Sequence, residues 1–104
     1  MYQDFDRLRE KIKKVLERYK ADFPEVKVDR DYFPLKISEE WGECMQAYLM
    51  LTDRGRNKGK TKEEMRAMLS DEFADVLGFL LLFGESEGID PAEALAKKWF
   101  KHLE

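Results

Sequence analysis

Four carboxylates of this chain form two pairs, each with the i, i+3 spacing that places side chains on one face of a helix. Glu40 and Glu43 make the first pair, and Glu72 and Asp75 make the second. On a helical wheel, at about 100° per residue, Glu40 falls inside an apolar arc and Glu43 falls at its rim. Glu72 and Asp75 fall among apolar positions of their own segment. We therefore expect both pairs to point toward one interior.

Carboxylates inside a protein require a positive partner. Burying an unpaired carboxylate costs on the order of several kcal/mol, against a total stability of about 5–15 kcal/mol for a small domain. No Lys, Arg or His falls within the two apolar arcs, so we expect a bound cation. All-oxygen ligands favour Mg²⁺, Mn²⁺ or Ca²⁺ over zinc or copper. The alternative is that the acids are solvated charges on helix surfaces.

Other chemistries lack the residues that they need. A di-iron carboxylate bundle uses Glu-x-x-His pairs, and the one histidine, His102, lies near the C-terminus. That histidine has no second histidine beside it to assemble a nucleophile system. The single Cys44 is interpreted as a small buried hydrophobe. Metal-assisted hydrolysis of phosphate esters or anhydrides remains.

A phosphate ligand would need cations in addition to the metal. Candidates come before the first acid pair, from the basic stretch after it, and from the last predicted helix: Lys36, Arg54, Arg56, Lys58, Lys60, Lys97, Lys98 and Lys101. For each of them taken alone, a solvated surface cation is the alternative.

Hydrophobic periodicity predicts four helices that would position these groups, and no strand pattern competes. Thr61 with Glu64 has the capping-box pattern, Gly88 is a stop signal, and Asp90 followed by Pro91 is a start signal. The predicted helices span residues 3–20, 34–53, 62–87 and about 91–103. This pattern predicts an all-α fold, either an antiparallel four-helix bundle or hairpins that pair across a dimer.

Length and composition set the remaining expectations. The 104 residues, 43% of them apolar, predict a single domain over residues 1–104 with a modest core that a second copy completes. We expect a homodimer or a dimer of dimers. A net charge of −3 gives no footprint for a nucleic-acid polymer. The charged N-terminus and the lack of a long apolar run predict a cytoplasmic location and no membrane partner.

The run Glu39-Glu40-Trp41-Gly42-Glu43, followed by Glu72-Phe73-Ala74-Asp75, resembles the EExxE and ExxD signature of the MazG-like, all-α NTP pyrophosphatase superfamily. The likeness covers about residues 34 to 101. It implies that Glu40, Glu43, Glu72 and Asp75 bind Mg²⁺, with Mn²⁺ as a possible substitute. It also implies that Glu39 acts with Glu40 and Glu43 in catalysis. Candidates for stacking on the base are aromatic residues of the first helix and its connector: Tyr19, Phe23, Tyr32 and Phe33.

The reaction that this resemblance implies is hydrolysis of a nucleoside triphosphate to a monophosphate and pyrophosphate, as nucleotide-pool house-cleaning. Deoxyuridine triphosphate is one candidate substrate. Phosphoribosyl-ATP pyrophosphohydrolase is an alternative within the same fold, and a non-catalytic, metal-stabilised helical regulatory dimer is an alternative of another class. The last segment, Lys97 to His102, lacks the Asn and the closing Arg-Tyr that many family members carry.

Overall fold

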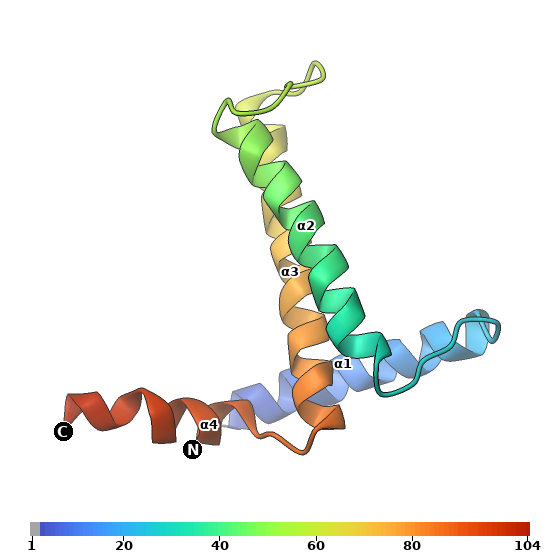
Figure 1. Ribbon diagram of the computed structural model, residues 1–104, viewed down its shortest axis with the longest axis vertical. Coiled ribbons are helices and arrows are strands. Elements are labelled where there is room, and N and C mark those ends of the chain that lie inside the picture. Colours follow the sequence, from blue (N-terminus) through green and yellow to red (C-terminus); the bar gives the residue numbers. More distant parts are fainter. Residues whose placement is uncertain (1–2) are drawn as a thin grey trace. The chain divides into compact units, whose positions relative to one another are not determined.

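The computed structural model describes residues 3–104, and within that range it contains helices and no strand (Figure 1). The elements are α1 (Gln3–Asp22), α2 (Tyr32–Leu51), α3 (Lys62–Ser86), α4 (Pro91–Lys98) and the 3₁₀ helix η1 (Phe100–Leu103). The all-α prediction is confirmed. No described helix has both the length and the apolar character needed to cross a bilayer.

The predicted end of the last helix is wrong. The α-helix stops at Lys98, and the amide of His102 donates to the carbonyl of Trp99 at 3.0 Å in the tighter 3₁₀ pattern. Every residue from Lys97 to the C-terminus is exposed. Since helices in proteins are stabilised chiefly by packing of an apolar face, nothing buried supports a longer α-helix here.

The chain divides into two compact units. One unit is residues 33–80, which contains most of α2 and the larger part of α3. The other contains the residues before it together with Leu81–Glu104, so α3 contributes to both. We describe each unit by itself.

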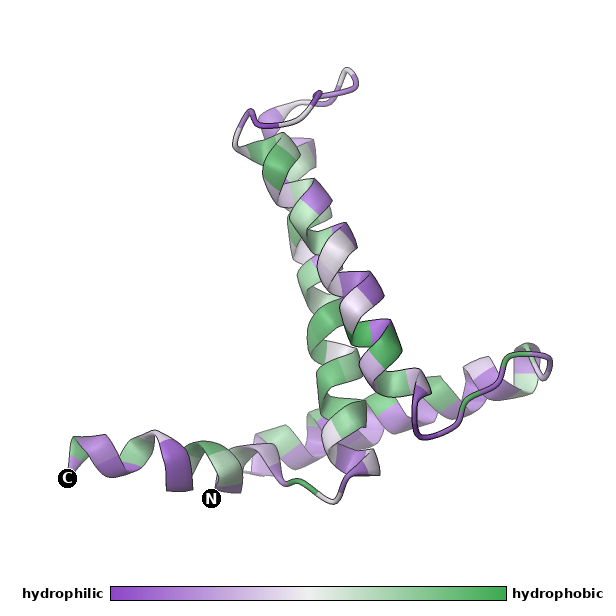
Figure 2. Ribbon diagram, viewed as in Figure 1, coloured by the Kyte–Doolittle hydropathy of each residue, from purple (hydrophilic) through white to green (hydrophobic). Residues whose placement is uncertain are grey.

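Within residues 33–80, α2 and α3 form an antiparallel helical hairpin. Lys36, early in α2, lies with its ammonium 5.5 Å from the ring centroid of Phe79, late in this part of α3. The buried residues of α2 recur every three or four positions, as Glu40, Cys44, Ala47 and Met50. This stripe faces α3, and the predicted burial of Cys44 is confirmed. Figure 2 shows apolar and polar residues interspersed along both helices.

The start of α3 has the predicted capping box. The amide of Glu64 donates to Thr61 Oγ1 at 3.1 Å, and the amide of Thr61 donates to Glu64 Oε1 at 3.0 Å. The bond from the Thr61 amide, together with the Thr61 side chain, holds the pKa of the Glu64 carboxyl below its ordinary value. Two amides that the helix cannot satisfy are therefore paired, which fixes where the loop ends and α3 begins.

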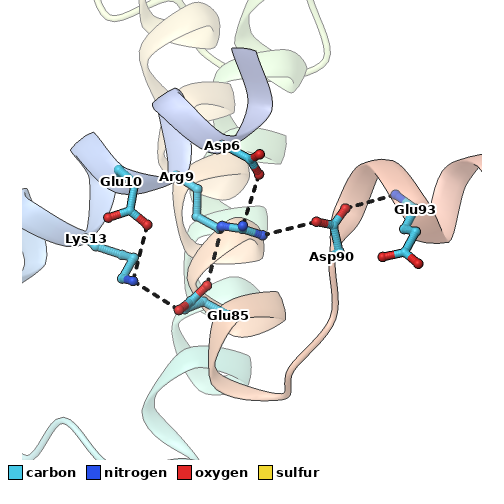
Figure 3. A network of polar contacts seen from close by, with 7 residues as sticks. All are labelled: Asp6, Arg9, Glu10, Lys13, Glu85, Asp90 and Glu93. Carbon is cyan, nitrogen blue, oxygen red and sulfur yellow. Dashed lines mark hydrogen bonds and ion pairs between the residues drawn. The ribbon is translucent and has the colours of Figure 1, made fainter. Parts of the chain in front are cut away.

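In the other unit, Arg9 of α1 is the centre of an ion-pair network (Figure 3). Its guanidinium, 17% exposed, lies 3.1 Å from Asp6, 3.4 Å from Glu85 and 3.9 Å from Asp90. Asp90 also accepts the amide of Glu93 at 2.9 Å as the N-cap of α4. One arginine thus joins α1, the end of α3 and the start of α4 within this unit.

The capping box generates a stability prediction. We expect Thr61→Ala to lower the free energy of unfolding by about 1 kcal/mol, because it leaves the Glu64 amide without its acceptor. Thr61→Ser keeps the hydroxyl and serves as the matched control. Urea unfolding of both variants at neutral pH checks this, and equal stability of the two variants would contradict the capping role.

Candidate metal centre

The two predicted acid pairs meet between α2 and α3. Ligand oxygens of Glu40, Glu72 and Asp75 lie within 4.8 Å of one another, and so do those of Glu39, Glu40 and Glu43. Glu40 belongs to both groups and is therefore the centre of the cluster. The structure thus brings together all five carboxylates that the sequence singled out.

Glu40 is the buried member of the cluster. Its side chain is only 10% exposed, and its Oε2 has no hydrogen-bond partner among the described residues. Oε2 of Glu72, which is half-buried, has none either. Buried acceptors without donors are costly, so these two oxygens are suited to a ligand that supplies positive charge.

Asp75 does not point into the interior as predicted. It is exposed, as are Glu39 and Glu43. Two packed helices cover only a narrow stripe of each other, and Asp75 lies at the edge of that stripe. The cluster therefore has a buried centre at Glu40 and an open rim where a ligand can enter.

The surroundings of Glu40 favour its neutral form. Burial raises the pKa of Glu40 above its ordinary value, and a hydrogen bond and the charge from Glu43 add to this, with a smaller contribution from Asp75. Lys36 opposes the shift in pKa. The balance means that the protein alone does not fully compensate a charged carboxylate at this position.

Lys36, which the sequence analysis proposed as a phosphate contact, lies beside the acids of the cluster. Its ammonium pairs with Glu39 Oε1 and lies 3.5 Å from Glu40 Oε1. The signal was present in the sequence, because i, i+3 and i, i+4 neighbours on a helix meet whatever the apolar arc of that helix. The absence of a cation from the apolar arcs therefore did not exclude a cation next to them.

Two of the acids also line a groove of about 520 Å³. Glu43 and Glu72 lie in its wall with the loop cations Arg56 and Lys58 and with Gln46. Sequence reasoning missed Gln46, although it stands one turn after Glu43 on the same helix.

The remaining predicted site residues belong to other surroundings. Lys97, Lys98 and Lys101 are exposed in the unit that contains α4. Phe33 is part of the buried core of the hairpin. The rings of Tyr19 and Phe23 contact each other, with centroids 5.0 Å apart. A role in base stacking stays a prediction for these aromatics and for Tyr32, as phosphate binding does for the three lysines.

A scan against protein-family models and searches of curated proteins and of solved structures found no match for this chain.

The environment of Glu40 predicts a pH-dependent stability. A carboxyl group whose pKa is raised on folding stabilises the folded state most at a pH below its unfolded pKa, near 4.5. That stability is lost as the pH rises through the folded pKa. Because glutamine does not titrate, we expect Glu40→Gln not to show this loss of stability. With a chelator present to remove metal ions, the variant should gain stability relative to wild type as the pH rises from 4 to 7. Thermal unfolding across that range measures the difference. Glu63→Gln, at an exposed position on α3, is the control. A constant difference between wild type and Glu40→Gln would contradict the account.

Proposed function

We propose that this protein is a Mg²⁺-dependent nucleoside triphosphate pyrophosphohydrolase. The observation that supports the proposal is the buried Glu40 carboxylate, with one oxygen lacking a donor, at the centre of four further carboxylates from two helices. The donor set consists of oxygens alone, which fits a hard divalent cation such as Mg²⁺ or Mn²⁺. The EExxE and ExxD pattern supports the choice of reaction.

In this proposal Glu40, Glu72 and Asp75 hold the cation between the helices, and Glu43 completes the ligand set from the rim. A bound divalent cation would neutralise phosphate charge and activate water. Glu39 is exposed beside Glu40 and is suited to accept the proton of the attacking water. Water adds to the phosphate chain, the anhydride bond between the α and β phosphates breaks, and a nucleoside monophosphate and pyrophosphate leave.

Lys36 has a structural part in this proposal. Its ammonium pairs with Glu39 and approaches Glu40, so it offsets part of the negative charge of the cluster. Because it contacts the face of Phe79, its position along the hairpin is fixed by both helices. In this proposal Lys36 therefore orients Glu39 and Glu40 toward the bound ligand. Direct contact of this lysine with phosphate stays a prediction.

The test is pyrophosphate release from a panel of canonical and modified nucleoside triphosphates, dUTP and phosphoribosyl-ATP, with Mg²⁺ and with chelator. We expect metal-dependent turnover that Asp75→Asn lowers by roughly a hundredfold or more, as losses of transition-state stabilisation of about 3 kcal/mol do. Asp71→Asn is the matched control, because Asp71 is an exposed aspartate one turn earlier on α3 and outside the cluster. It should retain wild-type turnover.

The panel also separates the alternatives. Turnover of phosphoribosyl-ATP and of no other substrate would identify the protein as a phosphoribosyl-ATP pyrophosphohydrolase. An Mg²⁺-dependent rise in melting temperature with no turnover of any substrate would contradict the hydrolase and support a metal-stabilised regulatory protein.

We also propose that two copies associate through the hairpin. Phe73, Leu77 and Leu80 recur at i, i+4 and i+7 along α3 and are 60%, 40% and 50% exposed. Among the residues that the structure describes, no side chain is completely buried, so the hydrophobic core is thin. A row of large apolar side chains on a thin core is the kind of surface that a second copy covers.

Sedimentation velocity tests the association. We expect Phe73→Gln to shift the protein from dimer, or dimer of dimers, toward monomer. Ala74→Gln places the same side chain about 100° around the helix, outside the row, and should leave the assembly unchanged. A monomeric wild type would overturn the proposal.

A further inference from the structure

The groove beside the carboxylate cluster is lined by both acidic and basic side chains. Its volume is about 520 Å³, and its lining includes Glu43 and Glu72 from the two helices and Arg56 and Lys58 from the loop between them. Leu49, Met50 and Met68 supply apolar wall between these groups. A ligand that lies along this groove would therefore meet acids and cations in one binding site.

The structure distinguishes the cations of this loop, and Lys62 at the start of α3, from one another. Arg54 donates to the carbonyl of Thr52 at 3.3 Å and does not line the groove. Lys62 is held by the carbonyl of Leu51 at 2.7 Å and by Asp53 at 2.6 Å. By contrast, Arg56 and Lys58 have no ion pair among the described residues and both line the groove.

The loop backbone holds Lys58 in a defined conformation. Lys58 and Gly59 both have positive φ, at 55° and 77°. The side chain of Asn57 accepts the Gly59 amide at 3.0 Å, and the backbone of Asn57 accepts the Lys60 amide at 3.0 Å. A non-glycine residue at positive φ is locally strained, and here the hydrogen bonds to Asn57 hold the turn in this conformation. The backbone from which the Lys58 side chain extends is therefore in a defined conformation.

We propose that Arg56 and Lys58 bind the outer phosphates of a polyphosphorylated ligand whose metal ion is held by the carboxylate cluster, to which Glu43 and Glu72 of the groove belong. This inference rests on the proposed function for the identity of the metal-bound end. The cations themselves supply what such a ligand needs, a planar guanidinium fork and an ammonium, each without an internal counter-ion. Binding then depends on the number of phosphates, because a ligand with a single phosphate has no outer phosphate for Arg56 and Lys58 to contact.

The test uses inorganic tripolyphosphate as the probe, with Mg²⁺, measured by calorimetric titration. The variant Arg56→Gln with Lys58→Asn removes both groove cations, and asparagine tolerates the positive φ at position 58. The variant Arg54→Gln with Lys60→Asn removes the same charge from the same loop but leaves the groove lining intact. Circular dichroism of both variants confirms that each is folded.

We expect the groove variant to bind tripolyphosphate roughly tenfold more weakly or worse, since a hydrogen bond to a charged group contributes about 1.5–3 kcal/mol and 1.4 kcal/mol is tenfold. The control variant should stay within about twofold of wild type. Equal losses in the two variants would overturn the inference, because the loop would then act only through its net charge. Wild-type affinity in the groove variant would overturn it as well.

The outcomes separate this inference from the proposed function. Turnover of nucleotides with no difference between the two double variants would keep the hydrolase and reject the role of Arg56 and Lys58. Selective loss of tripolyphosphate binding in the groove variant of a protein without turnover would keep the polyphosphate site and reject the hydrolase. Each result is read against wild type under the same Mg²⁺ concentration and ionic strength.

Discussion

A carboxylate held away from water is the constraint on which the rest of the hairpin depends. Glu40 occupies a position in the buried stripe of α2 that would suit an apolar side chain, between Phe33 and Cys44 in the same row. Replacing such a residue by a charged one costs stability unless the charge is compensated. The hairpin therefore buries a carboxylate that the described residues do not fully satisfy.

The negative charge of Glu40 is only partly compensated among the described residues, and the compensating cation is Lys36 of the same helix. Lys36 offsets charge at Glu39 and at one oxygen of Glu40, while the other oxygen of Glu40 has no hydrogen-bond partner among the described residues. A complete set of internal partners would stabilise the fold and leave no room for a ligand. The arrangement resembles other functional sites in this respect, because groups aimed at a ligand are commonly unpaired in its absence.

The sequence was sufficient to predict the helices, because their signals are local. The periodicity of apolar residues, the capping box at Thr61 and the stop at Gly88 each act within a few residues, and the predicted bounds of α1 to α3 agree with the structure to within two positions. The last helix was predicted too long, because propensity alone does not reveal that nothing packs against its end. The choice of acids was also predictable, because their i, i+3 spacing specifies a shared face.

The rest of the candidate site depends on packing between helices. The wheel placed Asp75 inside, but the depth of the contact between α2 and α3 decides exposure, and Asp75 lies at its edge. The groove depends on where the folded loop places Arg56 and Lys58 relative to Glu43 and Glu72, so the sequence offered four loop cations without distinguishing among them. Local rules identify the groups that are available, and tertiary contacts select those that act together.

The measurement that tests the central claim most directly is the binding of Mn²⁺, followed by its paramagnetic resonance signal, to wild type and to Glu40→Gln. Mn²⁺ reports on hard oxygen ligands without any assumption about substrate. The account predicts saturable binding by wild type, weakened at least tenfold when Glu40 loses its charge. Equal binding by the two proteins, or no binding by either, would contradict the claim that the buried carboxylate is the centre of a metal site.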